Sequence, residues 1–309
     1  MNIGIDSIAY YLPNHRLDTL GFCNRFDVSE RLIREKTGFL KLVQKEDEQE
    51  TSDLAVQAVR RLASETALVL DDVECIAVVT QNPDGFGLPH TSAIVHNKLS
   101  LRNTCSAFDI SLGCSGYVYA LSLMKGFMQN NQLSTGILIT ADPYSKIIDK
   151  DDKNTCLLFG DAATATLLTE QGDWQLGLCD FGTDGAGNNV LNVDDARTLH
   201  MNGRAVFNYS VKYIPQSILK TLEKNQMQLS DINHVVMHQG SKFIIQTLAE
   251  RLSIENQHLF FAYEYGNTIS SSIPLVLAKE QFLEKSGNVL ISGFGVGFSW
   301  ATSILTNNS

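Results

Sequence analysis

Three side chains in this sequence are of types that nucleophilic catalysis uses. They are Cys114, His238 and Asn267. A thiolate attacks carbonyl carbon, an imidazole moves a proton or donates a hydrogen bond, and an amide donates to a developing oxyanion. Each residue also has an ordinary alternative, namely a buried packing thiol, a core histidine and a helix cap. The surrounding sequence has to decide between these interpretations.

Cys114 follows a short apolar segment, residues 107–110, and precedes a helical pattern of apolar residues. The order predicts a thiol near the N-terminus of a helix. Unpaired N–H groups and the positive end of the helix dipole gather there, and both favour a thiolate.

His238 stands at the exit of the apolar strand expected at residues 234–237. It is a candidate general base or hydrogen-bond donor. Asn267 lies in a segment rich in Ser and Thr, residues 265–274, and its amide offers two neutral donors.

Two segments of small residues are expected to pack close to the site. Gly293, Gly295 and Gly297 recur at every second position, which does not fit the G-x-G-x-x-G spacing of a dinucleotide loop. They predict a turn whose backbone N–H groups approach a reacting carbonyl. Residues 159–165 are also small, and they predict tight packing beneath the site.

The chain contains a faint internal repeat. Asp53 is expected to cap a helix that runs to about Ala67, and a strand from Cys75 to Thr80 follows. A helix over 211–225 and a strand over 234–237 match these elements at a shift of about 159 residues.

The second part of the repeat pairs Cys114 with Asn267. The dipeptide Gly113-Cys114 opens a helix, and a strand follows about 23 residues later; Gly266-Asn267 has the same relation to a strand about 22 residues on. We therefore expect two pseudo-symmetric α/β halves, residues 1–168 and 169–309, with largely parallel sheets. Sites in such sheets form beyond the carboxyl ends of the strands, so the repeat predicts that Cys114, His238 and Asn267 meet in one crevice.

Composition excludes several classes of function. The 309 residues are 44% hydrophobic and 19% charged, with a net charge of −10 and no run of Lys and Arg, so a nucleic-acid partner is not expected. Six scattered cysteines without C-x-x-C indicate neither a zinc site nor a disulfide framework. No signal peptide and no apolar run of membrane-spanning length is evident. We expect a soluble, cytoplasmic protein in which a free thiol stays reduced.

Taken in order, motifs along almost the whole chain resemble the ketoacyl-acyl-carrier-protein synthase III family of the thiolase superfamily. The segments that carry the resemblance are Tyr11-Leu12-Pro13, Lys36-Thr37-Gly38, Phe108-Asp109-Ile110, Cys114-Ser115-Gly116, Phe159-Gly160-Asp161, Met201-Asn202-Gly203-Arg204, Val206-Phe207, His238-Gln239, Gly266-Asn267-Thr268 and the final Gly-rich turn. Each is weak alone, and the ordered set is specific.

The resemblance implies a thiolase-like fold of α-β-α-β-α layers and a Cys-His-Asn condensing enzyme. Cys114 would accept an acyl primer as a thioester. His238 and Asn267 would bind the carbonyl of a malonyl thioester and stabilise the enolate formed on decarboxylation. The backbone N–H groups of Cys114 and Val296 would form the oxyanion hole. No metal and no redox cofactor is implied.

The resemblance also implies the partners. The primer would be an acyl-CoA or acyl-ACP, the donor malonyl-ACP or malonyl-CoA, and the assembly a homodimer in which the loop at residues 86–89 closes the partner's acyl pocket. Nothing suggests a nucleic-acid or membrane partner. The residues expected to contact substrate are Leu32, Lys36, Leu88, Lys153, Gly203, Phe207 and Ser241.

Departures from the family pattern concern substrate recognition. Leu32 and Lys36 stand where the family has the Trp and Arg of its adenine clamp, and Lys153 replaces an Arg. Arg-to-Lys is not conservative at a stacking site. After His-Gln the chain runs Gly240-Ser241-Lys242-Phe243 in place of Ala-Asn and a later Arg, and Val296 replaces a Gly. These changes weaken an assignment to acetyl-CoA initiation of fatty acid synthesis and leave room for a specialised primer.

Three other functions remain open from the sequence. An acyltransferase of the same fold would pass the acyl group from Cys114 to a hydroxyl or amine. A Cys-His-Asn protease is disfavoured by the repeated helix–strand halves. A catalytically silent subunit is disfavoured because all three residues are present.

Overall fold

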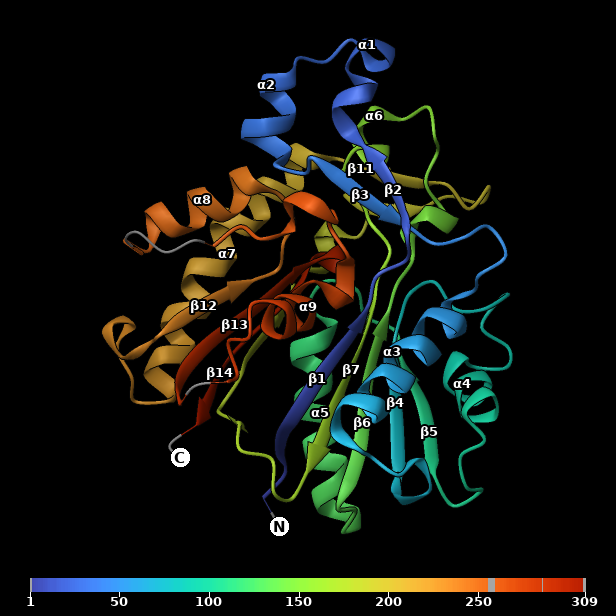
Figure 1. The fold of residues 1–309 in the computed structure, drawn as a ribbon. Helices are drawn as coiled ribbons and strands as arrows, with labels where there is room; N and C mark the ends of the chain where they lie inside the picture. Colours follow the sequence, from blue (N-terminus) through green and yellow to red (C-terminus); the bar gives the residue numbers. More distant parts are fainter. Residues whose placement is uncertain (1, 255–258, 285, 308–309) are drawn as a thin grey trace.

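Two mixed β-sheets form the centre of the molecule, and layers of helices lie outside and between them (Figure 1). The computed structural model describes residues 2–254, 259–284 and 286–307. The first sheet has the strand order β1-β7-β6-β4-β5, with bounds Gly4–Tyr11, Ala163–Thr169, Thr135–Ala141, Cys75–Val79 and Ser106–Ile110. The second sheet has the order β12-β13-β14-β8, with β9 also paired to β14, and its bounds are His234–Met237, Gly287–Gly295, Ser299–Asn307, Gln175–Leu176 and Asp180–Thr183.

The two sheets repeat one pattern of strand directions. In the first, β4 is parallel to β5 and β6, and β7 is antiparallel to β6 and β1. In the second, β12 is parallel to β13, and β14 is antiparallel to β13 and β8. The order β1-β7-β6-β4 therefore corresponds to β8-β14-β13-β12, as two pseudo-symmetric halves require.

The expectation of largely parallel sheets is wrong, because each sheet is mixed. The reason is clearest in the second half, where only the short turn Val296–Phe298 separates β13 from β14. Antiparallel strands can be joined by so short a turn, whereas parallel strands need a long crossover.

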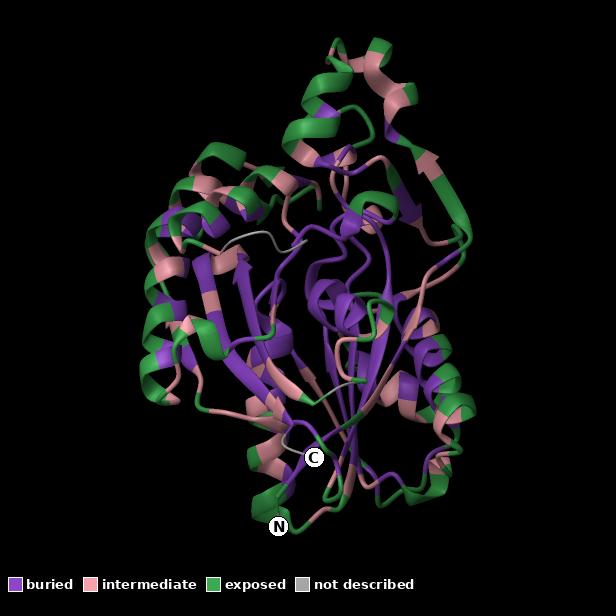
Figure 2. Ribbon diagram, turned by 60° about the vertical axis from the view of Figure 1, so that its left-hand side comes forward, coloured by how far each residue is buried: buried purple, intermediate pink, exposed green. Residues whose placement is uncertain are grey.

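Six helices complete the layers (Figure 1). They are α3 (Thr51–Thr66) and α4 (Thr91–Leu99) outside the first sheet, α5 (Gly116–Asn131) and α9 (Ser272–Lys279) between the sheets, and α7 (Gly203–Lys224) and α8 (Lys242–Arg251) outside the second sheet. The strands and both central helices are mostly buried, and the outer helices bury one face only (Figure 2). This arrangement confirms the expected α-β-α-β-α order of layers.

Shorter elements gather at one end of the molecule (top of Figure 1). They are β2 (His15–Asp18), α1 (Cys23–Phe26), α2 (Glu30–Leu32), β3 (Lys41–Gln44), α6 (Lys153–Cys156), β10 (Leu191–Val193) and β11 (Leu199–Met201). None of the helices in the described ranges combines the length and apolarity needed to cross a membrane.

Several element boundaries differ from expectation. Glu50 holds the N-cap position of α3, and Asp53 lies in the first turn, where its Oδ2 accepts a hydrogen bond of 2.9 Å from the Glu50 backbone N–H. Helix α7 begins at Gly203, eight residues before the expected start, because Asn202 caps it by accepting from the Ala205 N–H. The strand expected at 234–237 is confirmed as β12.

We expect Gly160→Ala to destabilise the fold, because the added Cβ would lie 1.9 Å from the carbonyl oxygen of Tyr265, a backbone atom. Overpacking of this kind costs about 1–3 kcal/mol or more. Gly126→Ala is the matched control, because Gly126 is exposed in α5 and nothing lies within 4 Å of its Cβ position. It should be neutral or stabilise by up to about 1 kcal/mol. Thermal melts of both variants measure the difference; equal melting temperatures would contradict the packing argument.

Candidate active site

One cavity of about 370 Å³ brings Cys114, His238 and Asn267 together. Four further residues that the sequence put at a substrate site also line it, namely Lys36, Gly203, Phe207 and Ser241. The remaining lining residues are Thr37, Leu158, Phe159, Leu191, Met201, Arg204, Val206, Gly240, Phe243, Ile244, Phe294 and Gly295.

Three expected substrate residues lie outside this cavity. Leu32 on α2 is 42% exposed, and Leu88 in the loop before α4 is 92% exposed. Lys153 is exposed at the start of α6. These side chains face solvent in the single chain.

Cys114 lies two residues before α5 and is held against the turn between β13 and β14. A Cβ on Gly293 would lie 2.7 Å from the Cys114 carbonyl oxygen, and one on Gly295 would lie 2.7 Å from Cys114 Sγ. Only glycine allows the turn to come this close. The approach places the Val296 backbone N–H within hydrogen-bonding reach of the thiol sulfur, beside the N–H of Cys114 itself.

The thiol of Cys114 is buried, and its protonation differs from the expectation drawn from the helix dipole. Burial raises the pKa of Cys114 to about 12, and the nearby Asp142 carboxylate adds to the increase. The N–H groups of Val296 and Cys114 act to lower this pKa but do not offset burial. Desolvation disfavours the charged form, so the resting group is a neutral thiol.

His238 follows β12 directly and is also buried. Burial lowers its pKa to about 3, against a smaller opposing effect of a backbone hydrogen bond with Ile269. Its Nδ1 lies 2.7 Å from the hydroxyl oxygen of Ser272, the first residue of α9. The imidazole is therefore neutral over the physiological pH range.

Asn267 is positioned by a strained turn. Its Oδ1 accepts a hydrogen bond of 3.0 Å from the Ile269 N–H, so its Nδ2 is the end left to donate. Ile269 has φ +53°, which is uncommon for a β-branched residue and costs conformational energy. The backbone of Ile269 thus hydrogen-bonds with the side chains of both Asn267 and His238.

The small-residue segment at 159–165 packs beneath Asn267 as expected. The Gly160 N–H donates to the Asn267 carbonyl at 2.9 Å, and the Asn267 N–H donates to the Leu158 carbonyl at 2.8 Å. Asp161 is fully buried and accepts from the Lys45 N–H and from the Ser145 N–H and hydroxyl. These bonds tie the Asn267 segment to the first half of the chain.

An aromatic pair with a cation lies at the exposed side of the cavity. Phe207 and Phe243 are stacked with ring centroids 5.2 Å apart and planes 15° apart. The Lys36 ammonium lies 3.4 Å from the centroid of Phe243. Such a contact stabilises by about 0.5–1 kcal/mol at an exposed site. The sequence marked Phe243 only as a departure from a family pattern, and its ring stacking was not predicted.

Sequence reasoning missed Asp142 and Tyr144. They follow β6 directly, and the rule that sites form at carboxyl ends of strands, applied above to His238, would have found them. Both are buried; burial raises the pKa of Asp142 to about 7 and places that of Tyr144 well above its usual value.

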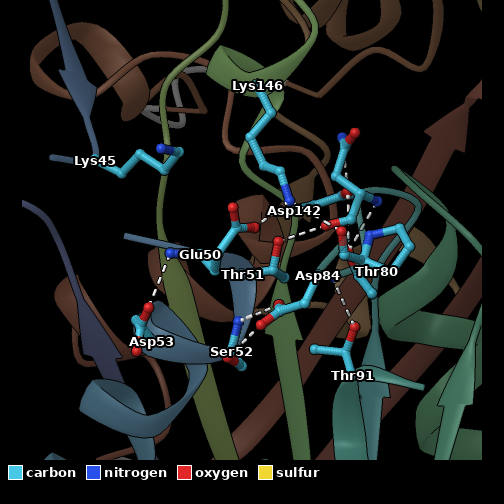
Figure 3. A network of polar contacts seen from close by, with 12 residues as sticks. Lys45, Glu50, Thr51, Ser52, Asp53, Thr80, Asp84, Thr91, Asp142 and Lys146 are labelled. Atoms are coloured by element: carbon cyan, nitrogen blue, oxygen red, sulfur yellow. Dashed lines mark hydrogen bonds and ion pairs between the residues drawn. The ribbon is translucent and has the colours of Figure 1, made fainter. Parts of the chain in front are cut away.

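Polar contacts fix the loops that follow β4 and β6 (Figure 3). The Lys146 ammonium donates to Glu50 at 2.6 Å and to the Pro83 carbonyl at 2.9 Å. Ser52 at the start of α3 donates to Asp84 through its N–H and its hydroxyl. Together these bonds join the N-terminus of α3 to the carboxyl ends of β4 and β6.

The described ranges contain no group of three or more His, Cys, Asp or Glu side chains that could hold a metal ion.

We expect alkylation of Cys114 by iodoacetamide to accelerate steadily from about pH 6 to 9. The reason is that burial holds the thiol pKa near 12, and below its pKa the thiolate fraction rises about tenfold per pH unit. Mass spectrometry of the Cys114 peptide measures the rate, with Cys114→Ala as background. A plateau below about pH 8 would mean that the helix N-terminus outweighs burial and holds a thiolate.

Comparison with known proteins identifies the family of the chain. The model of 3-oxoacyl-[acyl-carrier-protein (ACP)] synthase III matches residues 108–196, and that of its C-terminal domain matches residues 222–307. A β-ketoacyl-[acyl-carrier-protein] synthase III of Clostridium perfringens is 32% identical over 98% of this chain and 99% of the relative. One from Listeria monocytogenes is 30% identical over 99% of both chains. The crystal structure of 3-oxoacyl-(acyl carrier protein) synthase III from Pseudomonas aeruginosa PAO1 superposes with a TM-score of 0.92 at 27% identity, covering 100% of this chain and 99% of that one. By sequence and by fold, the chain belongs to the 3-oxoacyl-[acyl-carrier-protein] synthase III family of condensing enzymes.

Proposed function

We propose that this protein joins an acyl primer to a malonyl unit by decarboxylative condensation, with Cys114 as the nucleophile. The observation that carries the proposal is the cavity whose lining Cys114, His238 and Asn267 share. Cys114 attacks the primer thioester, a new S–C bond forms, and the carrier thiol leaves with the proton. The malonyl thioester then loses carbon dioxide, and the resulting enolate carbon attacks the acyl-Cys114 carbonyl. The Cys114 sulfur departs, and a 3-oxoacyl thioester remains.

His238 and Asn267 serve in this proposal as neutral hydrogen-bond donors to the malonyl thioester carbonyl. The Ser272 hydroxyl oxygen accepts from the Gln239 N–H at 3.4 Å and lies 2.7 Å from His238 Nδ1. In this proposal the hydroxyl donates to Nδ1, and the imidazole proton resides on Nε2. Neutral donors suit the enolate, because they stabilise negative charge as it develops without binding the malonyl carboxylate first.

The Cys114 and Val296 N–H groups form the oxyanion hole in this proposal. Both already reach the Cys114 sulfur, so an oxyanion on the attached acyl carbon would lie near the same donors. The Val296 side chain packs toward Gly113, whose Cβ position is 3.0 Å from Val296 Cγ1. A glycine at position 296 would leave that space empty.

The alternative is an acyltransferase that passes the acyl group from Cys114 to a hydroxyl or amine. Such a reaction has no enolate to stabilise and does not need an amide donor at Asn267. The lining of the cavity by both His238 and Asn267 favours condensation.

The outer side of the cavity is the proposed route for the pantetheine arm. Lys36, Gly203, Phe207 and Ser241 line it, and we extend the proposal to the exposed Leu32 and Lys153 at the same end of the molecule. The primer would arrive as acyl-CoA or acyl-ACP and the donor as malonyl-ACP or malonyl-CoA. In this proposal the stack of Phe207 and Phe243 beside Lys36 takes the place of the family's Trp and Arg clamp for the CoA adenine. This difference favours a specialised substrate.

The proposal also covers the division of the chain, its location and its assembly. We propose two thiolase-like halves, residues 1–168 and 169–309, a cytoplasmic location and a homodimer. The loop at residues 86–89 supports the dimer, because Phe86 is 84% and Leu88 92% exposed in the single chain. Side chains this apolar are usually covered by a partner when they gather on one loop.

Product analysis by mass spectrometry tests the reaction. The protein is mixed with acyl-CoA and acyl-ACP primers and malonyl-ACP, and we expect a 3-oxoacyl product. Cys114→Ala should lower acylation at least about a thousandfold, because the nucleophile is lost. Asn267→Ala should spare acylation and lower condensation about 100- to 1000-fold, because one donor to the enolate is lost.

Two residues outside the lining of the cavity, the half-buried Cys23 and the exposed Asn131, supply matched controls. Cys23→Ala removes a thiol on α1, and Asn131→Ala removes an amide at the end of α5; both should retain the activity of the unmodified protein. Acyl mass on Cys114 without a later carbon–carbon bond would contradict condensation and favour the acyltransferase. Unchanged condensation in Asn267→Ala would contradict the role given to that amide.

Light scattering after size-exclusion chromatography tests the dimer. We expect a mass twice the 34.1 kDa of the chain. The double substitution Phe86→Asp with Leu88→Asp should shift the protein toward the single chain, because two charges would enter an apolar contact. A mass of 34.1 kDa for the unmodified protein at assay concentration would contradict the proposal.

A further inference from the structure

Two polar groups in the surroundings of Cys114 are incompletely satisfied by protein partners. Asp142 is 1% exposed, and its Oδ2 is buried with no hydrogen-bond partner among the described residues. Tyr144 is 3% exposed, and its hydroxyl makes no hydrogen bond to another described residue. Neither group has a part in the condensation steps above.

Both groups belong to the surroundings of the nucleophile. Tyr144 is in the same buried cluster as Cys114, Phe159 and Ile269. Besides burial, the proximity of Asp142 and Cys114 raises the pKa of the Tyr144 hydroxyl, and the proximity of Asp142 raises that of the Cys114 thiol. The remaining walls of this cluster are apolar, formed by Leu191 and Leu199 from β10 and β11.

The Asp142 carboxyl is held in one orientation. Its Oδ1 receives the Gln81 N–H at 3.1 Å, the Asn82 amide at 3.3 Å and the Thr80 hydroxyl at 3.5 Å. The carboxyl therefore cannot rotate to exchange its two oxygens without losing these bonds. Lys146, four residues later, does not neutralise the Asp142 carboxylate, because its ammonium is bonded to Glu50 and to the Pro83 carbonyl (Figure 3).

A buried acceptor without a partner is unfavourable until a water or a ligand satisfies it. The pair would be satisfied together by one hydroxyl group, which accepts from the Tyr144 O–H and donates to Asp142 Oδ2. Because burial raises the pKa of Asp142 to about 7, the accepting carboxylate form is well populated at neutral pH.

We propose that Tyr144 and Asp142 form a polar end of the primer site, so that Cys114 accepts a short acyl group bearing a hydroxyl in preference to the matching alkyl group. The proposal rests on the acylation of Cys114 proposed above and adds the class of primer. The Tyr144 and Phe159 rings, with centroids 5.1 Å apart, close the space behind the sulfur and set the short length.

Loading of Cys114 by matched thioester pairs tests the proposal. The pairs are glycolyl with acetyl, and 3-hydroxybutyryl with butyryl, each on CoA and on acyl carrier protein, with acyl mass on Cys114 followed over time. We expect the hydroxyacyl member of at least one pair to load about tenfold faster or more, because a site built for a hydroxyl rejects the analogue that lacks it. Tyr144→Phe and Asp142→Asn should each reduce that preference at least about fivefold while alkyl loading persists.

Tyr117→Phe is the matched control. It removes a buried hydroxyl of α5 that bonds to Thr166 at 3.2 Å on β7, and it should leave the preference unchanged. Equal loading within every pair, or a preference that survives in Tyr144→Phe, would overturn the primer proposal and leave condensation standing. Circular dichroism checks that Tyr144→Phe is folded, and this variant tests the proposal even where the Asp142 variant fails to fold. Absence of loading from all four acyl groups would overturn the proposed acylation and the primer class with it.

Discussion

The close approach of the Gly293–Val296 turn to Cys114 is the contact on which the rest of the site depends. It joins the second half of the chain to Cys114 in the first, at positions where a Cβ would lie 2.7 Å from Cys114 atoms. The contact buries the thiol and brings the Val296 N–H to its sulfur. The turn joins β13 to β14, which pair antiparallel. The contact with Cys114 therefore depends on this antiparallel pairing in the second sheet.

Burial produces a site of neutral groups. The same removal of water that raises the pKa of Cys114 to about 12 lowers that of His238 to about 3. Neutral donors placed in a low-dielectric cavity stabilise a developing charge more than they would in water. The cost falls on the nucleophile, whose proton must leave during acylation. Ile269, held at φ +53° between Asn267 and His238, shows that local strain is accepted to keep the donors in place.

The departures from the family pattern do not touch Cys114, His238 or Asn267 themselves. Lys36, Ser241 and Phe243 line the cavity, Leu32 and Lys153 lie outside it, and Val296 lies next to Cys114. Retention of the three central residues with a changed lining fits the proposed change of substrate, because the proposed condensation does not depend on the identity of the primer or its carrier.

The sequence alone determined the family, the layered fold and the three residues of the cavity, because ordered motifs and the repeat of helix and strand are local signals. It placed β12 at its observed bounds and matched Cys114 with Asn267 in the two halves. Tertiary structure alone decided the mixed strand directions and the protonation of Cys114. A helix dipole can be inferred from residues near the thiol, but desolvation depends on the second half folding over it. Tyr144 packs in the same buried cluster as Cys114 for the same reason: burial is a property of the assembled chain and of no single segment.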